Sequence, residues 1–194
     1  MSVLGIDFFA RDSEVVAIEL VGHYLVFERP EARLAGIVVE TEAYFGPEDP
    51  ASHAYRGTTP RNTVMFGRAG MSYVYFNYGS CYLLNVVTRL IDEPGAVLIR
   101  ALEPIEGIEF MKQRRECDRV KELTSGPGRL TQAFGITKTE NGLDMTNGGP
   151  LRFEENPNLP DIVNVKASKR IGISKGKDLL YRFYMKDNLF VSKK

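Results

Sequence analysis

The sequence is poor in residues that build disulfide or metal frameworks. Its 194 residues include only two cysteines, Cys81 and Cys117, two histidines, His23 and His53, and no tryptophan. Two cysteines are too few for a disulfide scaffold or a four-cysteine metal site, and no acidic or cysteine cluster completes a ligand set around either histidine. We therefore expect no metal, no cofactor and a reducing, cytoplasmic compartment.

Long apolar runs are missing as well. No basic segment followed by an apolar stretch opens the chain, and no uninterrupted apolar run is long enough to span a bilayer. We therefore expect a soluble protein with no membrane partner. The first lysine of the chain is Lys112. Before it, the positively charged side chains are all arginines, which cannot act as amine nucleophiles. A Schiff-base mechanism drawn from the first half of the chain is thereby excluded.

The sequence carries no net charge, because 25 Lys and Arg residues balance 25 Asp and Glu residues. A zero balance argues weakly against a nucleic-acid partner, since phosphate neutralisation usually requires a basic excess. The charges are unevenly distributed, however, with an acidic excess in residues 1–50 and a basic excess from residue 165 onward. This distribution is compatible with one cationic face or with an ordinary solvated surface.

Length and apolar content predict one domain covering residues 1–194, because 43% hydrophobic residues can form one continuous core. Helices are expected at 13–20 with Asp12 or Ser13 as cap, from Pro104 through 123, and from 125 to 134. Strands are expected at 24–27, 36–44, 72–76, 81–88, 96–101, 151–153, 162–165 and 180–185. The turn signal at residues 77–80 predicts that 72–88 is a β-hairpin.

The strand predicted at 36–44 carries two carboxylates. With a side-chain period of two, Glu40, Glu42 and Tyr44 share one face, and the two glutamates lie about 6.5–7 Å apart. Burying an unpaired carboxylate costs on the order of several kcal/mol, so a buried pair requires partners. The alternative is an exposed edge strand that the glutamates keep soluble. Tyr44 and the aromatic and arginine residues of the predicted loop at 46–70 favour a functional site.

The predicted hairpin presents aromatic side chains. Tyr73, Tyr75 and Asn77 face one way, and Tyr78 lies at the turn. A turn tyrosine either covers the hairpin or acts as a wedge that replaces an extruded base in a nucleic-acid duplex. Asn85 lies within an apolar run, so it is expected to be buried, either satisfied structurally or reading a substrate.

A series of motifs runs in order along nearly the whole chain. The first half contains Val39-Glu40-Thr41-Glu42-Ala43-Tyr44, Gly46-Pro47-Glu48-Asp49, Ser52-His53, Thr59-Pro60-Arg61-Asn62 and Met65-Phe66. Further along are Tyr73-Val74-Tyr75, Tyr78-Gly79, Asn85, Val97-Leu98-Ile99-Arg100-Ala101-Leu102-Glu103-Pro104, Ser125-Gly126-Pro127 and Arg182-Phe183-Tyr184. Together these motifs closely resemble the alkyladenine (3-methyladenine) DNA glycosylase family. Linked motifs of this length are far more specific than any single short pattern.

The resemblance implies a monofunctional DNA repair glycosylase without a cofactor. Such an enzyme flips an alkylated or otherwise damaged purine out of duplex DNA and hydrolyses its N-glycosidic bond, leaving an abasic site. The implied fold is α+β, a single mixed domain with a curved, largely antiparallel β-sheet flanked by helices and a protruding β-hairpin. The implied partner is double-stranded DNA containing damaged purines, bound by a monomer in the cytoplasm with the chromosomal DNA.

Roles for individual residues also follow from the resemblance. Glu42 is implied to activate the attacking water, with Arg100 helping to position it. The implied base-binding residues are Tyr44 and His53 on one face of the base, Tyr75 on the other, Asn85 discriminating against guanine, and Met185 narrowing the pocket. Tyr78 is implied to intercalate into DNA, and Arg61, Ser125 and Gly126 to contact its backbone. Ordinary helix capping explains Ser125 and Gly126 equally well.

Asn77 and Ser80 depart from the family pattern, because apolar residues are expected on either side of Tyr78. This departure predicts a shallower insertion or a different lesion preference. Two other interpretations of the chain stay open: a catalytically inactive binder of damaged or distorted DNA, and a hydrolase of free nucleosides.

Overall fold

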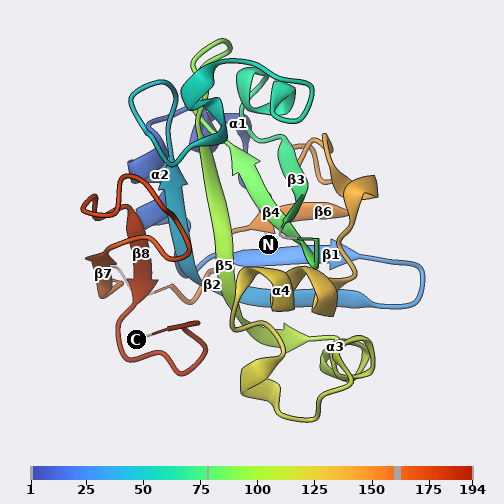
Figure 1. The fold of residues 1–194 in the computed structure, drawn as a ribbon. Helices are drawn as coiled ribbons and strands as arrows, with labels where there is room; N and C mark the ends of the chain where they lie inside the picture. The colour runs from blue at the N-terminus through green and yellow to red at the C-terminus, as the bar shows by residue number, and fades with distance from the viewer. Residues whose placement is uncertain (1, 78, 160–162, 194) are drawn as a thin grey trace.

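A single antiparallel sheet organises the computed structural model, which describes residues 2–77, 79–159 and 163–193. Its strands are β1 (Tyr24–Glu28), β2 (Arg33–Tyr44), β3 (Ser72–Asn77), β4 (Cys81–Val87), β5 (Ala96–Glu106), β6 (Leu151–Glu154), β7 (Val165–Ser168) and β8 (Arg182–Met185). The strand order is β3-β4-β5-β2-β1-β6, while β8 pairs with both β2 and β7. In Figure 1 the sheet curls, so that β4 runs steeply across the direction of β1 and β6. The predicted α+β fold with a curved antiparallel sheet is confirmed.

Strand β2 is long enough to pair with two different strands along one of its edges. Its first half pairs with β1, its second half pairs with β8 at residues 40–42, and β5 lies along its other side. Leu34 and Val38 of β2 are fully buried and anchor the strand in the core. The exchange brings residues near the end of the sequence beside the carboxylates of β2.

Short helices cover the sheet. They are α1 (Ile6–Phe9), α2 (Ser13–Glu19), α3 (Ile108–Arg115) and α4 (Pro127–Phe134), with 3₁₀ turns η1 (His53–Arg56), η2 (Thr63–Phe66), η3 (Val120–Glu122) and η4 (Lys138–Glu140). The Asp12 side chain caps α2 by accepting a hydrogen bond from the Glu14 N–H. Helix α2 is bound to β2 by the Thr41 hydroxyl, which donates to the Ala17 carbonyl. None of the described helices is long and apolar enough to cross a membrane.

The main core joins both ends of the sheet to the helices. It contains Phe9, Leu25, Leu102, Phe134 and Phe153, which are all fully buried. Because this cluster includes side chains from α1, β1, β5, α4 and β6, one continuous core supports the strands that carry the site.

Two predicted elements are corrected. Pro104 does not open a helix: β5 continues to Glu106, with Pro104 opposite Gly36, and a register shift leaves Ile105 unpaired. Gly107 then adopts a left-handed conformation (φ 73°), and α3 begins only at Ile108. The strand expected at 162–165 is also displaced, since β7 begins at Val165 and Ile162 lies outside the described residues. The hairpin of β3 and β4 is confirmed, and Tyr78, which was predicted at its turn, lies outside the described residues.

Candidate active site

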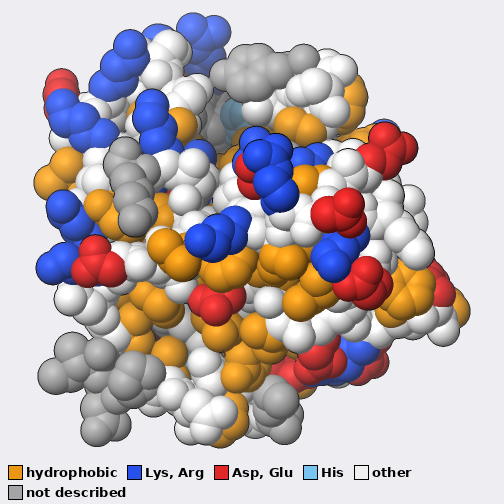
Figure 2. Space-filling view, turned by 90° about the horizontal axis from the view of Figure 1, so that it is seen from below, with side chains coloured by type: hydrophobic (Ala, Val, Ile, Leu, Met, Phe, Trp, Pro, Cys, Tyr) orange, Lys and Arg blue, Asp and Glu red, His pale blue; other side chains and the backbone are white. Residues whose placement is uncertain are grey.

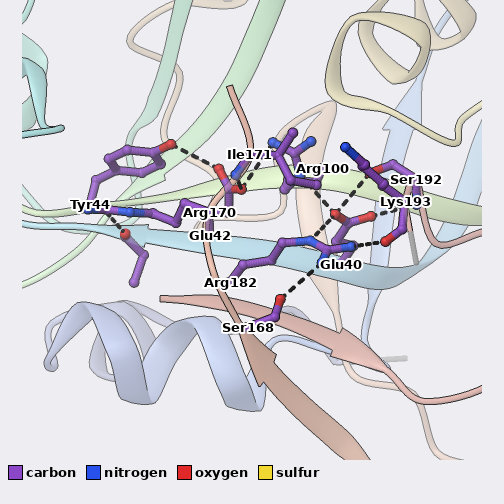
Figure 3. Close-up of polar contacts among 11 residues, drawn as sticks. Glu40, Glu42, Tyr44, Arg100, Ser168, Arg170, Ile171, Arg182, Ser192 and Lys193 are labelled. Carbon is purple, nitrogen blue, oxygen red and sulfur yellow. Dashed lines mark hydrogen bonds and ion pairs between the residues drawn. The ribbon is translucent and has the colours of Figure 1, made fainter. Parts of the chain in front are cut away.

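Both glutamates of β2 are fully buried, so the exposed-edge interpretation of this strand is wrong. Arg100 of β5 lies between them, as Figure 3 shows. Its Nε donates to Glu40 Oε1 at 2.9 Å, and its Nη1 lies 3.2 Å from Glu42 Oε1. One guanidinium therefore provides counter-charge for two buried carboxylates.

Two β-bulges allow this arrangement. Across the β2–β5 pair, Val38 is opposite Leu102 and Glu40 is opposite Ala101, which leaves Val39 as an extra residue on β2. Thr41 is then opposite Ile99, so Arg100 is an extra residue on β5. A bulge redirects the side chain of the unpaired residue, and here it accompanies the placement of Arg100 against the carboxylates.

Glu40 is held on several sides. Arg182 of β8 donates its Nε to Oε1 at 2.7 Å, and Ser192 donates its backbone N–H to Oε2 at 2.7 Å and its hydroxyl to Oε1 at 2.9 Å. Burial alone would raise the pKa of Glu40, but the charges of Arg100 and Arg182 outweigh burial and hold it below its ordinary value. Glu40 is therefore an ionised anchor for two arginines.

Glu42 has a different environment. The Ile171 N–H donates to Oε1 at 2.7 Å, and the Tyr44 hydroxyl donates to Oε2 at 2.9 Å. Burial raises the pKa of Glu42 above its ordinary value, and the charge of Arg100 together with these two hydrogen bonds offsets this only in part. The raised pKa makes the ionised carboxylate a stronger base than an exposed glutamate.

A cavity of about 580 Å³ lies next to Glu42. The three residues that contact the Glu42 carboxylate, Tyr44, Arg100 and Ile171, also line this cavity. The other lining residues include Pro50, Ala51, His53, Met65, Tyr73, Tyr75, Cys81, Leu83, Asn85, Leu98, Pro127, Gly128, Ile173 and Lys177. The cavity has the size of a small-molecule site, with the basic carboxylate directly behind its wall.

Three aromatic rings form one side of the cavity. The His53 ring meets Tyr75 edge to face at 4.6 Å between centroids, and the Tyr73 and Tyr75 centroids are 5.2 Å apart. The Tyr73 hydroxyl lies 2.8 Å from His53 Nδ1. His53 is exposed at the cavity, yet loss of water around the ring, with the charge of Arg61, lowers its pKa to about 4. His53 is therefore neutral at pH 7, while burial raises the pKa of Tyr73 to about 12.

The other base-pocket candidates divide between two places. Asn85 is buried, lines the aromatic cavity and donates its amide to the Tyr73 carbonyl at 3.0 Å. Met185 is instead part of a separate, smaller depression with Lys166, Tyr184 and Val191. The structure thus groups Tyr44, His53, Tyr75 and Asn85 and does not bring Met185 to them.

The residues expected at the DNA backbone lie near the cavity rim. Arg61 is exposed, stands 5.0 Å from the centre of the Tyr75 ring and donates to the Phe76 carbonyl at 3.1 Å. The Ser125 hydroxyl accepts a hydrogen bond from Arg129, and Gly126 has φ 140° at the start of α4, whose first two residues line the cavity. Tyr78, the expected wedge, lies outside the described residues.

Charge on the surface is less segregated than along the sequence. Arg170 and Arg182 belong to the basic excess after residue 165, but both are buried in ion pairs with Asp49 and Glu40 of the acidic first segment. On the face seen in Figure 2, basic side chains gather along one edge, and both signs are mixed with hydrophobic side chains elsewhere. Part of the acidic excess of residues 1–50 and part of the basic excess after residue 165 therefore neutralise each other inside the molecule.

Several residues that complete the site could hardly be predicted from sequence patterns. Ile171 and Ser192 act through backbone N–H groups, which leave no mark in side-chain chemistry. Arg182 is part of a family-like motif but has no signal of its own that links it to Glu40, 142 positions earlier. Within the described part of the chain, no group of three or more His, Cys, Asp or Glu side chains is arranged to hold a metal.

Comparison with known proteins identifies the class. A family model described as Methylpurine-DNA glycosylase (MPG) matches residues 7–189. A relative from Carboxydothermus hydrogenoformans, named "Putative 3-methyladenine DNA glycosylase", is 50% identical over 97% of this chain and 97% of its own. Relatives of the same name from Prosthecochloris aestuarii and Francisella tularensis are 48% and 47% identical, covering 96% and 92% of this chain and 89% and 92% of theirs.

The matches and the site together define a DNA glycosylase, a hydrolase of N-glycosyl bonds. More specifically, the chain belongs to the methylpurine-DNA glycosylase family.

Proposed function

We propose that this protein excises alkylated or otherwise damaged purines of the 3-methyladenine type from duplex DNA, after flipping the nucleotide into the aromatic cavity. The observation that carries this proposal is the position of Glu42, a buried carboxylate of raised pKa behind the wall of that cavity. The released base and an abasic site in an unbroken strand are the products.

One carboxylate is sufficient for the reaction. Alkylation at N3 or N7 makes the purine cationic, so it departs with the electron pair of the C1′–N bond and becomes neutral. The sugar that remains has oxocarbenium character, and the oxygen of a water molecule forms the new C1′–O bond. Glu42 accepts the proton of that water, and its negative charge stabilises the developing positive charge on the sugar.

The neighbours of Glu42 prepare it for this role. Arg100 and the Ile171 N–H both contact Oε1, and the Tyr44 hydroxyl contacts Oε2, so the carboxylate is fixed in one orientation. Arg100 is in turn fixed by Glu40, which has a lowered pKa and stays charged. A preorganised carboxylate need not reorient when charge develops at C1′.

The aromatic cavity supports binding of a flat, electron-poor base. Tyr44, His53 and Tyr75 offer ring faces and edges of the kind that stack on flipped bases. When the Tyr73 hydroxyl donates to Nδ1 of the neutral His53, the imidazole proton is on Nε2 and is available to an acceptor on the base. We assign Asn85 to the discrimination against guanine, Tyr78 to the wedge, and Arg61, Ser125 and Gly126 to the DNA backbone, all within a monomer.

The test uses duplexes that each carry one defined damaged purine, alongside an undamaged duplex and the free damaged nucleoside. We expect release of the damaged base from the duplex and strand breaks only after added alkali. In E42Q, base release should fall about 10²- to 10⁴-fold, the usual contribution of a general base, while lesion binding is retained. E109Q, which changes an exposed glutamate on α3, is the matched control and should match the wild type.

The alternatives predict other results. A wild-type protein that binds the lesion duplex without releasing base is a binder of damaged DNA. Equal rates on the nucleoside and on the duplex identify a nucleoside hydrolase. Either result contradicts the proposal.

A further inference from the structure

A further buried ion pair, between Arg170 and Asp49, lies behind the site. Arg170 Nη1 donates to Asp49 Oδ2 at 2.6 Å and Nη2 donates to Oδ1 at 2.7 Å, so the contact is bidentate. Both side chains are almost completely buried, at 0% and 1% exposure. Arg170 also donates to the Ala43 carbonyl at 2.9 Å. We call this pair the Arg170–Asp49 clamp.

The clamp joins two segments that are far apart in the sequence. Asp49 accepts hydrogen bonds from the backbone N–H groups of Phe45 and Ala51, which fixes the loop that follows β2. Arg170 lies in the connection between β7 and β8. Both segments form walls of the cavity, the first through residues 50, 51 and 53, the second through residues 171–174 and 177. The clamp therefore holds two cavity walls together.

Two contacts of Glu42 depend on the same arginine. The Arg170 guanidinium carbon lies 4.6 Å from the centre of the Tyr44 ring, and the Tyr44 hydroxyl donates to Glu42 Oε2. The residue after Arg170 is Ile171, whose N–H donates to Glu42 Oε1. In Figure 3, Arg170 extends between Tyr44 and Glu42. Displacing Arg170 would loosen both oxygens of the carboxylate.

We propose that Arg170 and Asp49 are positioning residues of this reaction, which set the orientation and basicity of Glu42 without touching the substrate. This inference rests on the function proposed above. Stability alone is a poor reason for the pair, because buried ion pairs are often replaceable by apolar residues without loss. A bidentate pair gives fixed geometry, and an error of about 1 Å at a reacting group can reduce a rate about 10²-fold.

Loss of the clamp should change the pH profile of the reaction. The charged and titratable groups facing Glu42 are Arg100 of β5, Glu40 and Tyr44 of β2, and Arg170. Without the clamp, the Ile171 hydrogen bond, which helps to lower the pKa of Glu42, is weakened, and the positive charge at position 170 is no longer held near Glu42. Both changes raise that pKa further. The rate should then begin to fall at a higher pH on the acidic side of the profile.

The experiment compares R170K, which keeps the charge but not the bidentate fork, with D49N and with the control D178N. Asp178 pairs with Lys169 beside Arg170, but this pair is exposed, at 95% and 62%. Single-turnover rates on a duplex with one 7-methylguanine are measured across pH 5–9, together with the Kd for that duplex and the urea unfolding curve.

We expect R170K and D49N to lose about 10- to 100-fold in rate at neutral pH, with the acidic limb moved to higher pH and the Kd little changed. D178N should behave as the wild type. If R170K and D49N are folded and have wild-type rates and pH profiles, or if neither folds, the clamp is only structural and the inference fails. A wild-type protein inactive in the same assay would instead refute the proposed function.

Discussion

Replacement of Arg100 by methionine gives the sharpest test of the buried carboxylate pair. Glu40 would keep Arg182 and both donors of Ser192. Arg100 is the only cation within ion-pair distance of Glu42 among the residues the structure describes, so Glu42 would lose its counter-charge. The effect of R100M should therefore fall mainly on Glu42.

The expected magnitude follows from the contacts. Breaking a buried pair by removing one partner typically costs about 3–5 kcal/mol of unfolding free energy. A hydrogen bond to a charged group contributes about 1.5–3 kcal/mol. Each 1.4 kcal/mol of lost stabilisation of ionised Glu42 reduces its ionised fraction about ten-fold on the acidic side of its titration. R100M should thus be destabilised and much less active at neutral pH, with partial recovery of activity as the pH rises.

Single-turnover excision of 7-methylguanine from a duplex, measured from pH 5 to pH 10, checks this expectation alongside urea unfolding at pH 6 and pH 8. In the wild type, the rate should fall as the pH drops through the raised pKa of Glu42, because the base must be ionised. In R100M the same fall should begin at higher pH. R119M changes an exposed arginine and serves as the control. A uniform loss at all pH values would refute the argument, since Arg100 would then act on the substrate and not through Glu42.

Three further outcomes are expected. E40Q should lower the unfolding free energy by about 3–5 kcal/mol, because two buried arginines lose their shared carboxylate; a change under about 1 kcal/mol in urea would contradict this. H53Q should make stability less sensitive to acid. The pKa of His53 is about 4 in the folded protein, below its ordinary value of 6.5, so the unfolded chain binds the proton first and stability is lost as the pH falls from 6.5 toward 4. Comparing urea midpoints at pH 7.5 and 5 in both proteins tests it. R61A should reduce the slope of log Kd against log salt for duplex DNA by about 1, whereas R119A should leave the slope unchanged.

The sequence predicted those parts of the fold that depend on local pattern. The period-two alternation of residues 36–44 indicated β2 and its two glutamates, and the turn residues after Asn77 indicated the β3–β4 hairpin. The predicted common face of Glu40, Glu42 and Tyr44 led to the site because the strand is buried on that face. Local propensity was enough here, since neighbouring residues determine strand and turn.

Other parts depend on contacts that no local pattern encodes. Pro104 has the appearance of a helix start, yet pairing with Gly36 and the bulge at Ile105 keep the segment extended. The bulge that presents Arg100 is a property of the register between two strands. The Arg170–Asp49 contact joins residues 121 positions apart, and only the folded chain brings them together. The count of charges along the sequence therefore placed Arg170 on the surface, although it is buried.

The backbone of Ser192 reaches Glu40 across 152 positions, and the N–H of Ile171 reaches Glu42 across 129. Bringing residues so far apart together costs more chain entropy than a local contact does. A nascent or proteolytically nicked polypeptide without residues 170–192 would contain two acids in an apolar interior with most of their donors missing. Catalytic activity should then appear only with the complete tertiary structure, so incompletely folded molecules would not excise bases from DNA.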